Sequence, residues 1–147
     1  MRHEIDPGSV KFTNPGAWFE YSGDSRVDIF CHWLVDDVQN DPPHIIEIAD
    51  ALGRRMAGET TEVLEFSGNA WFITVAADGV EAANMFSDDQ AWLPLNDAAI
   101  VVYRYWESAR EFLRPARFDK AAKKFANRNQ IEPLLPWELD SWDLTPA

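Results

Sequence analysis

The sequence predicts an α+β fold, in which two or three helices pack on one face of an antiparallel sheet of about five strands. Three observations carry this prediction. Residues 26–35 and 62–86 alternate apolar and polar side chains with the period of two that is typical of strands. Residues 41–58 and 93–115 repeat apolar side chains at helical spacing. Asp78-Gly79 is a strong hairpin signal, which indicates that consecutive strands pair antiparallel.

The first elements are predicted from turn signals. An Asn-Pro-Gly turn at 14–16 separates two short expected strands, and a Ser-Gly-Asp turn follows at 22–24. Residues 26–35 (RVDIFCHWLV) are then expected to form a strand with Cys31 and Trp33 on its apolar face. His32 would point to the opposite face.

The next two elements are a helix and a meander. Asp41 can cap the N-terminus of a helix that opens with two prolines, and Gly58 suits its C-terminal cap. The stretch from about 62 to 86 then predicts a three-stranded antiparallel meander, with turns at 67–69 and 78–79. Trp71, Ile73 and Val75 share one face of it.

The C-terminal third is predicted to be helical, followed by a tail. Residues 93–115 form a helix that Asn96 or Asp97 can cap, and residues 119–128 form a shorter, basic one. We expect residues 1–128 to make a single α+β domain. The remaining residues, 129–147, carry three prolines and two tryptophans, and are expected to pack on the domain or to flank it.

The composition narrows the class of function. The formal net charge is −12, which argues against nucleic acid or an anionic membrane as the main ligand, because both require basic surface. Residues 110–128 are the exception, with seven basic and two acidic side chains. A single cysteine fits a reducing compartment, and no window is apolar enough for a signal peptide or a membrane span. We therefore expect a cytoplasmic protein.

The segment HWLVDDVQNDPPH (32–44) contains residue types found in metal and catalytic sites. No metal-binding spacing such as HExxH or an EF-hand loop is present, and Asp41 is explained as a helix cap. The sequence also lacks a nucleophile elbow and a phosphate-binding glycine loop. We therefore predict no catalytic residue, no metal and no cofactor, and keep carboxylate or metal chemistry around His32 and Asp36 as a minor alternative.

Protein binding is the function that remains. Acidic residues cluster near predicted turns and strand ends, with tryptophans close by, and aromatic anchors beside carboxylates suit a basic protein surface. Trp33 and Trp71 are expected in the core, whereas Trp92, Trp137 and Trp142 are expected at the surface. The predicted binding residues are Asp36, Asp37, Asp78, Asp88, Asp89 and Trp92.

Three segments of the chain, CHWLVDDVQNDPPHIIEIADAL, GNAWFITVAADGVEAANMF and LPLNDAAIVVYRYW, together resemble the small bacterial YacL-like proteins, whose function is uncharacterised. The resemblance covers roughly residues 28–113 and supplies no catalytic residues. It implies a regulatory or structural module, of which two copies could form a homodimer.

The hairpin pattern W-x-I-x-V-x-x-D-G-V-E before an LPL segment and a helix is also similar to acidic immunity proteins of polymorphic-toxin and contact-dependent growth inhibition systems. That resemblance implies a cytosolic protein that binds a cognate toxin domain and occludes its active site. Many such toxins are basic nucleases, which an acidic inhibitor suits electrostatically. A non-enzymatic immunity protein is the leading hypothesis, and the YacL-like module is the alternative.

Overall fold

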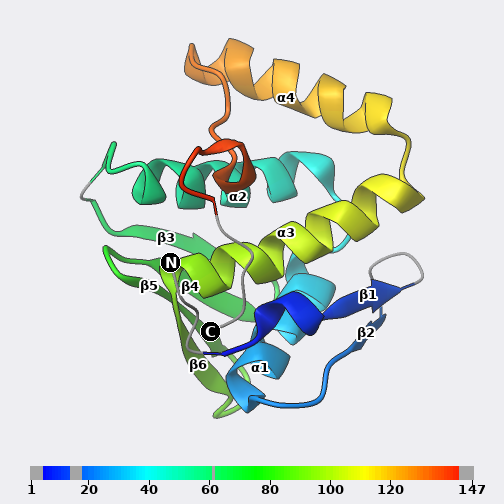
Figure 1. Ribbon diagram of the computed structural model, residues 1–147, viewed down its shortest axis with the longest axis vertical. Helices are drawn as coiled ribbons and strands as arrows, with labels where there is room; N and C mark the ends of the chain where they lie inside the picture. The colour runs from blue at the N-terminus through cyan, green and yellow to red at the C-terminus, as the bar shows by residue number, and fades with distance from the viewer. Residues whose placement is uncertain (1–4, 14–17, 61, 143–147) are drawn as a thin grey trace.

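The computed structural model describes residues 5–13, 18–60 and 62–142, which form helices stacked on an antiparallel sheet (Figure 1). The strands are β1 (Lys11–Thr13), β2 (Trp18–Glu20), β3 (Leu64–Ser67), β4 (Trp71–Val75), β5 (Gly79–Asn84) and β6 (Gln90–Pro94). The α-helices are α1 (Ser25–Trp33), α2 (Pro42–Met56), α3 (Leu95–Phe112) and α4 (Pro115–Asn129). The short helices are η1 (Pro7–Ser9) and η3 (Pro136–Glu138), both 3-10, and the π-helix η2 (Leu34–Val38). The predicted α+β class is confirmed.

The strands form two separate antiparallel sheets rather than one. β3, β4, β5 and β6 pair in chain order as a four-stranded meander, and β1 pairs only with β2. The meander therefore has one strand more than predicted. The extra strand is β6, in which Ala91 and Leu93 are buried while Trp92 between them is exposed. The Asp-Gly hairpin is confirmed, since β4 and β5 pair on either side of it.

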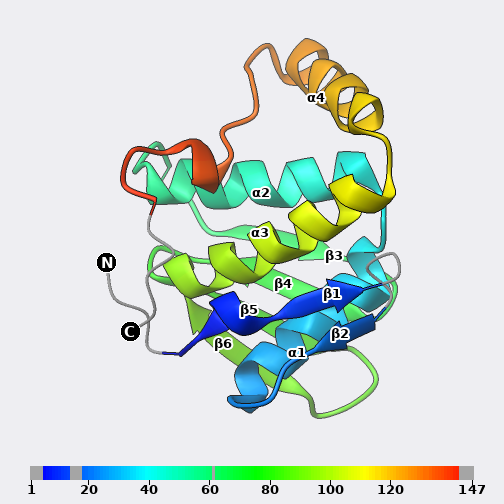
Figure 2. The ribbon, with the colours of Figure 1, turned by 45° about the vertical axis from the view of Figure 1, so that its right-hand side comes forward.

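The helices build up in layers from one face of the four-stranded sheet. α1 and α3 contact strands β5 and β6, α2 packs on α3, and α4 packs on α2. Figure 2 shows α4 as the element farthest from the sheet. Strand residues that face the helices are buried, among them Trp71, Ile73, Val80 and Leu93, and they join side chains of α1, α2 and α3 in one core. No described helix is both long and apolar enough to cross a membrane.

Residues 26–35 form a helix, so the strand predicted there is wrong. Val27, Cys31 and Trp33 fit a period of two, but Val27, Phe30, Cys31 and Leu34 also fit the helical period, and these four are buried. The side chain of Asp24 favours the helix, because its carboxylate accepts a hydrogen bond from Arg26 N at 2.9 Å and caps the helix. The predicted turn at 22–24 is therefore a helix start.

The predicted helices are confirmed with shifted ends. α2 ends just before Gly58, whose φ of +75° suits a residue without a side chain. Asp41 occupies the N-cap position of α2, but its side chain forms no capping hydrogen bond. Asn96 and Asp97 lie inside the first turn of α3 and are buried, so neither is the cap. The short helix begins at Pro115 instead of 119.

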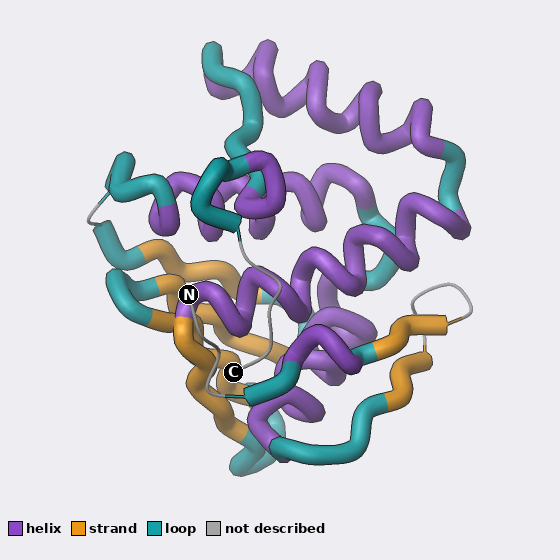
Figure 3. The backbone as a smooth tube through the Cα atoms, in the orientation of Figure 1, coloured by secondary structure: helices purple, strands orange, loops and turns teal. Residues whose placement is uncertain are grey.

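The chain after α4 folds back over α2, as Figure 3 shows for the loop that contains η3. Leu134 N donates to the Asp50 carboxylate at 2.8 Å, and Arg54 Nη2 donates to Glu132 O at 2.5 Å. Gly53 allows this approach, because a Cβ there would lie 1.7 Å from Leu134 O. The described part of the tail thus packs on the helices, while residues 143–147 lie outside the described residues.

We predict that Asp24→Ala lowers the free energy of unfolding by about 1 kcal/mol, because it removes the α1 cap. Hydrogen bonds from the Arg26 side chain hold the pKa of Asp24 below its ordinary value of 3.8. The stabilisation is therefore present above that value and is lost as the pH falls through the lower folded-state pKa. Urea denaturation at pH 7 and at pH 2.5 checks this. Equal losses for Asp24→Ala at both pH values would contradict it.

Candidate functional site

Asp36 and Asp37 lie in the π-helix η2 and point at the turn between β3 and β4. Asp37 Oδ1 accepts from Ala70 N at 3.1 Å, and Asp37 Oδ2 accepts from Trp71 N at 2.9 Å. Asp36 Oδ2 accepts from the indole Nε1 of Trp71 at 3.1 Å. Gly68 leaves the room for this contact, since a Cβ there would come within 2.3 Å of the Asp37 carboxylate. Both carboxylates therefore already have partners within the protein.

The other predicted site residues divide between the two ends of the sheet. Asp88 and Asp89 lie in the β5–β6 turn, which neighbours the β3–β4 turn because Met85 N donates to Ala70 O at 2.8 Å. The acids at 36, 37, 88 and 89 therefore share one end. Asp78 lies in the β4–β5 turn at the opposite end. Trp92 lies on β6, between the two ends.

The face of the sheet opposite the helices is not covered by any described element. Strand alternation and register place two rows of side chains on this outer face. Phe72 is 37% exposed and Trp92 is 39% exposed, whereas the inward neighbours of both are buried. The first row is Glu65, Thr74, Glu81 and Trp92, and the second is Ser67, Phe72, Ala83 and Gln90.

Trp92 is fixed in position by the strand beside it. Its indole lies over Gly79 so closely that a Cβ on that residue would meet ring atoms at 2.2–2.4 Å. It pairs across the ladder with Glu81, so an aromatic ring and a carboxylate stand side by side. A half-exposed ring held on a rigid strand loses little entropy on binding, which makes it a suitable contact residue.

The outer face is acidic and partly apolar. Its two rows contain two carboxylates, two large aromatic rings and neither lysine nor arginine. The β5–β6 turn extends this character, because Phe86 is 80% exposed beside Asp88 and Asp89. We call the two rows together with residues 85–89 the outer face. The sequence prediction missed Phe72, although its alternation with Trp71 and Ile73 already placed it opposite the core.

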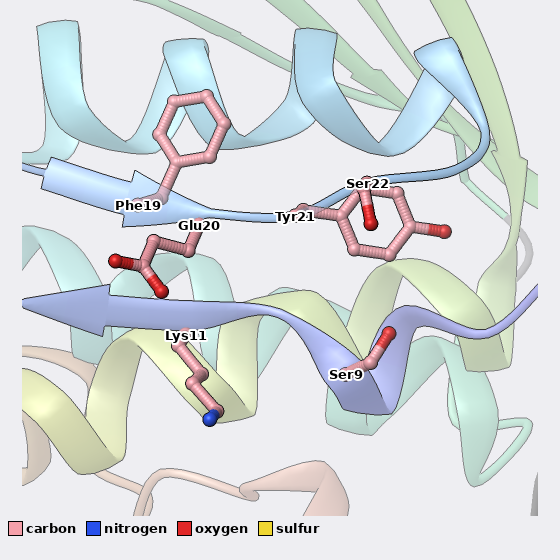
Figure 4. Close-up of a pocket in the computed structure, with 6 residues that line it drawn as sticks. All are labelled: Ser9, Lys11, Phe19, Glu20, Tyr21 and Ser22. Atoms are coloured by element: carbon pink, nitrogen blue, oxygen red, sulfur yellow. The ribbon is translucent and has the colours of Figure 1, made fainter.

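A polar pocket of about 510 Å³ lies beside the paired strands β1 and β2 (Figure 4). Lys11 and Glu20 are register partners across the two strands, and Lys11 extends away from Tyr21 and Ser22. Burial raises the pKa of Tyr21, so its hydroxyl stays protonated at neutral pH. These side chains do not converge on one point, and their arrangement indicates no particular reaction.

A second pocket, of about 360 Å³, lies where α2, the β4–β5 turn and the start of α3 meet, and Asp78 lines it. Arg55 in its wall is only 6% exposed. Its Nη1 donates to Thr60 O at 3.2 Å, but its Nε and Nη2 have no hydrogen-bond partner among the described residues. A buried guanidinium with one hydrogen bond costs stability unless something else satisfies it.

Cys31 and His32 do not form a nucleophile and base. Cys31 is fully buried in α1, and burial raises the pKa of its thiol far above the ordinary value, so the reactive thiolate is suppressed. His32 is exposed and meets Phe19 edge-on, with ring centroids 5.0 Å apart. Within residues 5–13, 18–60 and 62–142, no group of three or more His, Cys, Asp or Glu side chains is placed to hold a metal ion.

We predict that Asp37→Ala lowers the free energy of unfolding by about 1–3 kcal/mol, because it leaves two backbone N–H groups of the β3–β4 turn without their acceptor. Asp88→Ala is the matched control, since Asp88 is exposed and should change stability by less than about 0.5 kcal/mol. Chemical denaturation measures both variants. A loss of unfolding free energy for Asp37→Ala no larger than that for Asp88→Ala would contradict a stabilising role for the Asp37 contacts.

Arg54 and Arg55 are neighbours with opposite expected effects. Arg54 pairs with Asp50 at 2.9 Å and with Glu59 at 2.6 Å, so Arg54→Met should lower the free energy of unfolding by about 2 kcal/mol. Arg55→Met removes a buried, under-satisfied charge and should leave stability unchanged or raise it. Thermal denaturation of both variants tests this. A large loss for Arg55→Met would instead indicate that the guanidinium is fully satisfied.

Comparison with known proteins gave no relative for this chain. No family model matched it, and neither a curated protein nor a solved structure was significantly similar. The resemblances to YacL-like proteins and to immunity proteins therefore stay predictions.

Proposed function

We propose that this protein binds a basic partner protein through the outer face of its four-stranded sheet. One observation carries the proposal: Trp92 and Phe72 are exposed there beside Glu81 and Glu65, with no described element over them. Tryptophan and other large side chains at the centre of an interface contribute most of the binding energy. The carboxylates around them favour a partner that carries lysine or arginine.

The charge of the whole protein supports the same kind of partner. At a formal net charge of −12, the protein attracts basic molecules over distances of about a Debye length, roughly 8 Å in physiological salt. Such attraction mainly raises the association rate, whereas the aromatic contacts slow dissociation. Asp88 and Asp89 extend the acidic area, while Asp36 and Asp37 contribute little because their carboxylates are bonded to Trp71 and Ala70.

The biological activity we propose is inhibition, in which this protein is an immunity protein that occludes the active site of a cognate bacterial toxin domain in the cytosol. The resemblance of its hairpin and following helix to such immunity proteins supports this. The acidic, aromatic outer face also supports the proposal, because many of those toxins are basic nucleases. The proposal assigns no catalytic step to this chain.

The alternative is a YacL-like module that forms a homodimer. Two copies that met through the outer face would bring Glu65 and Glu81 of one copy close to the same acids of the other. Like charges in an interface cost binding energy. The acidic outer face therefore favours a basic partner over a second copy.

The test is binding to the toxin domain encoded beside the gene for this protein. We expect a submicromolar complex, and at least a tenfold loss of affinity for Trp92→Ala and for Phe72→Ala. Trp18→Ala and Phe112→Ala are matched controls, since these side chains are 69% and 58% exposed on other elements. Calorimetry gives the affinities, and circular dichroism confirms that each variant is folded.

The outcomes separate the two functions. Failure to form a submicromolar complex would contradict the immunity function, and equal losses for the controls would contradict the outer face as the site. Sedimentation equilibrium tests the alternative: a dimer of the wild-type chain that Trp92→Ala dissociates would favour the homodimeric module.

A further inference from the structure

A cleft of about 580 Å³ lies on the helical side of the molecule, where α3, α4 and the chain around η3 meet. Figure 2 shows α4 and the segment that leads down to η3 above α3. Three aromatic rings line the cleft. The Trp106 and Trp137 ring centroids are 4.9 Å apart, and Phe118 meets Trp106 at 6.0 Å with an interplanar angle of 78°.

The cleft already holds one guanidinium. The Cζ atom of Arg110 lies 4.6 Å from the centroid of Trp106 and 5.9 Å from that of Phe118. An arginine at this distance over a tryptophan face is attracted by the ring quadrupole. Arg110 takes part in none of the ion pairs of the described residues. Its own position therefore shows that the aromatic wall accommodates a planar cation.

Three carboxylates also line the cleft, those of Asp119, Glu132 and Glu138. None of them forms an ion pair within the described chain. Together they outnumber the single positive charge of Arg110 in the cleft. Aromatic faces and uncommitted carboxylates around one cavity are what a cationic side chain requires, because it can stack and form charge-assisted hydrogen bonds at once.

We propose that this cleft binds an arginine side chain of a partner polypeptide, which takes the place of Arg110 on the Trp106 ring and donates hydrogen bonds to Glu132 and Glu138. Arginine fits better than lysine, because a planar guanidinium stacks on a ring while its N–H edge stays free for a carboxylate. The inference goes beyond the proposed function, since no residue of the cleft belongs to the four-stranded sheet.

The experiment titrates the full chain, labelled with ¹⁵N, with the peptide acetyl-Gly-Arg-Gly-amide and follows the tryptophan indole signals. We expect saturable shifts at Trp106 and Trp137. The same peptide with lysine should bind at least threefold more weakly, and the peptide with glutamine should not bind. Arg110→Gln removes the internal competitor and should raise the affinity at least twofold.

The carboxylates are tested with charge-matched variants. Glu132→Gln combined with Glu138→Gln should weaken binding of the arginine peptide at least threefold in low salt. Glu111→Gln is the control, because Glu111 is an exposed carboxylate of α3 that does not line the cleft. Trp92→Ala should leave this binding unchanged, which separates it from binding at the outer face.

Two results would overturn the inference. The first is the absence of saturable indole shifts in both the wild-type chain and Arg110→Gln. The second is an equal loss of affinity in Glu111→Gln and in the Glu132/Glu138 double variant, because binding would then reflect the overall negative charge and not the cleft.

Discussion

The contact between the acidic pair of η2 and the β3–β4 turn joins the helices of this protein to its sheet. Asp37 accepts two backbone N–H groups of the turn, and Asp36 accepts the indole N–H of Trp71. Trp71 is buried in the core, so its orientation determines which face of β4 points to the helices. Because strand side chains alternate, this contact also determines that Phe72 points outward. The acids thus act on the outer face indirectly, by orienting the strand that displays it.

Elements with a single strong pattern were predictable from the sequence. The Asp-Gly pair indicates only a hairpin, and the apolar stripes of α2 and α3 fit only the helical period. All three elements are present. Residues 26–35 satisfy two periodicities, and the choice depends on a cap at Asp24 that also resembles a turn signal. The sequence does not separate β6 from α3, because Leu93-Pro94 at the end of the strand runs directly into the first residues of the helix.

The candidate site was predictable only where exposure follows from local alternation. Trp92 was expected at the surface and is half-exposed there. The partners of Asp36 and Asp37, in contrast, lie more than thirty residues away in sequence, and no local pattern encodes a contact of that range. The π-helix that aims these carboxylates is equally hard to foresee, because it depends on packing, including a hydrogen bond from the Tyr105 hydroxyl to Gln39 O. Trp137, which was expected at the surface, is partly buried against the core and lines a surface cleft.

The position of α4 has a consequence for how the molecule moves. Beyond Phe118, α4 is attached through a small apolar cluster of its own, in which Ala121 and Phe125 meet Ile46 of α2 apart from the main core. A helix with so little buried apolar surface can detach without unfolding the rest, so its amides should exchange with solvent through a local opening. Phe118 would leave the cleft in that opening, and a ligand held there would slow the exchange of α4. We therefore expect the local stability of the outermost helix to depend on what occupies the cleft beneath it.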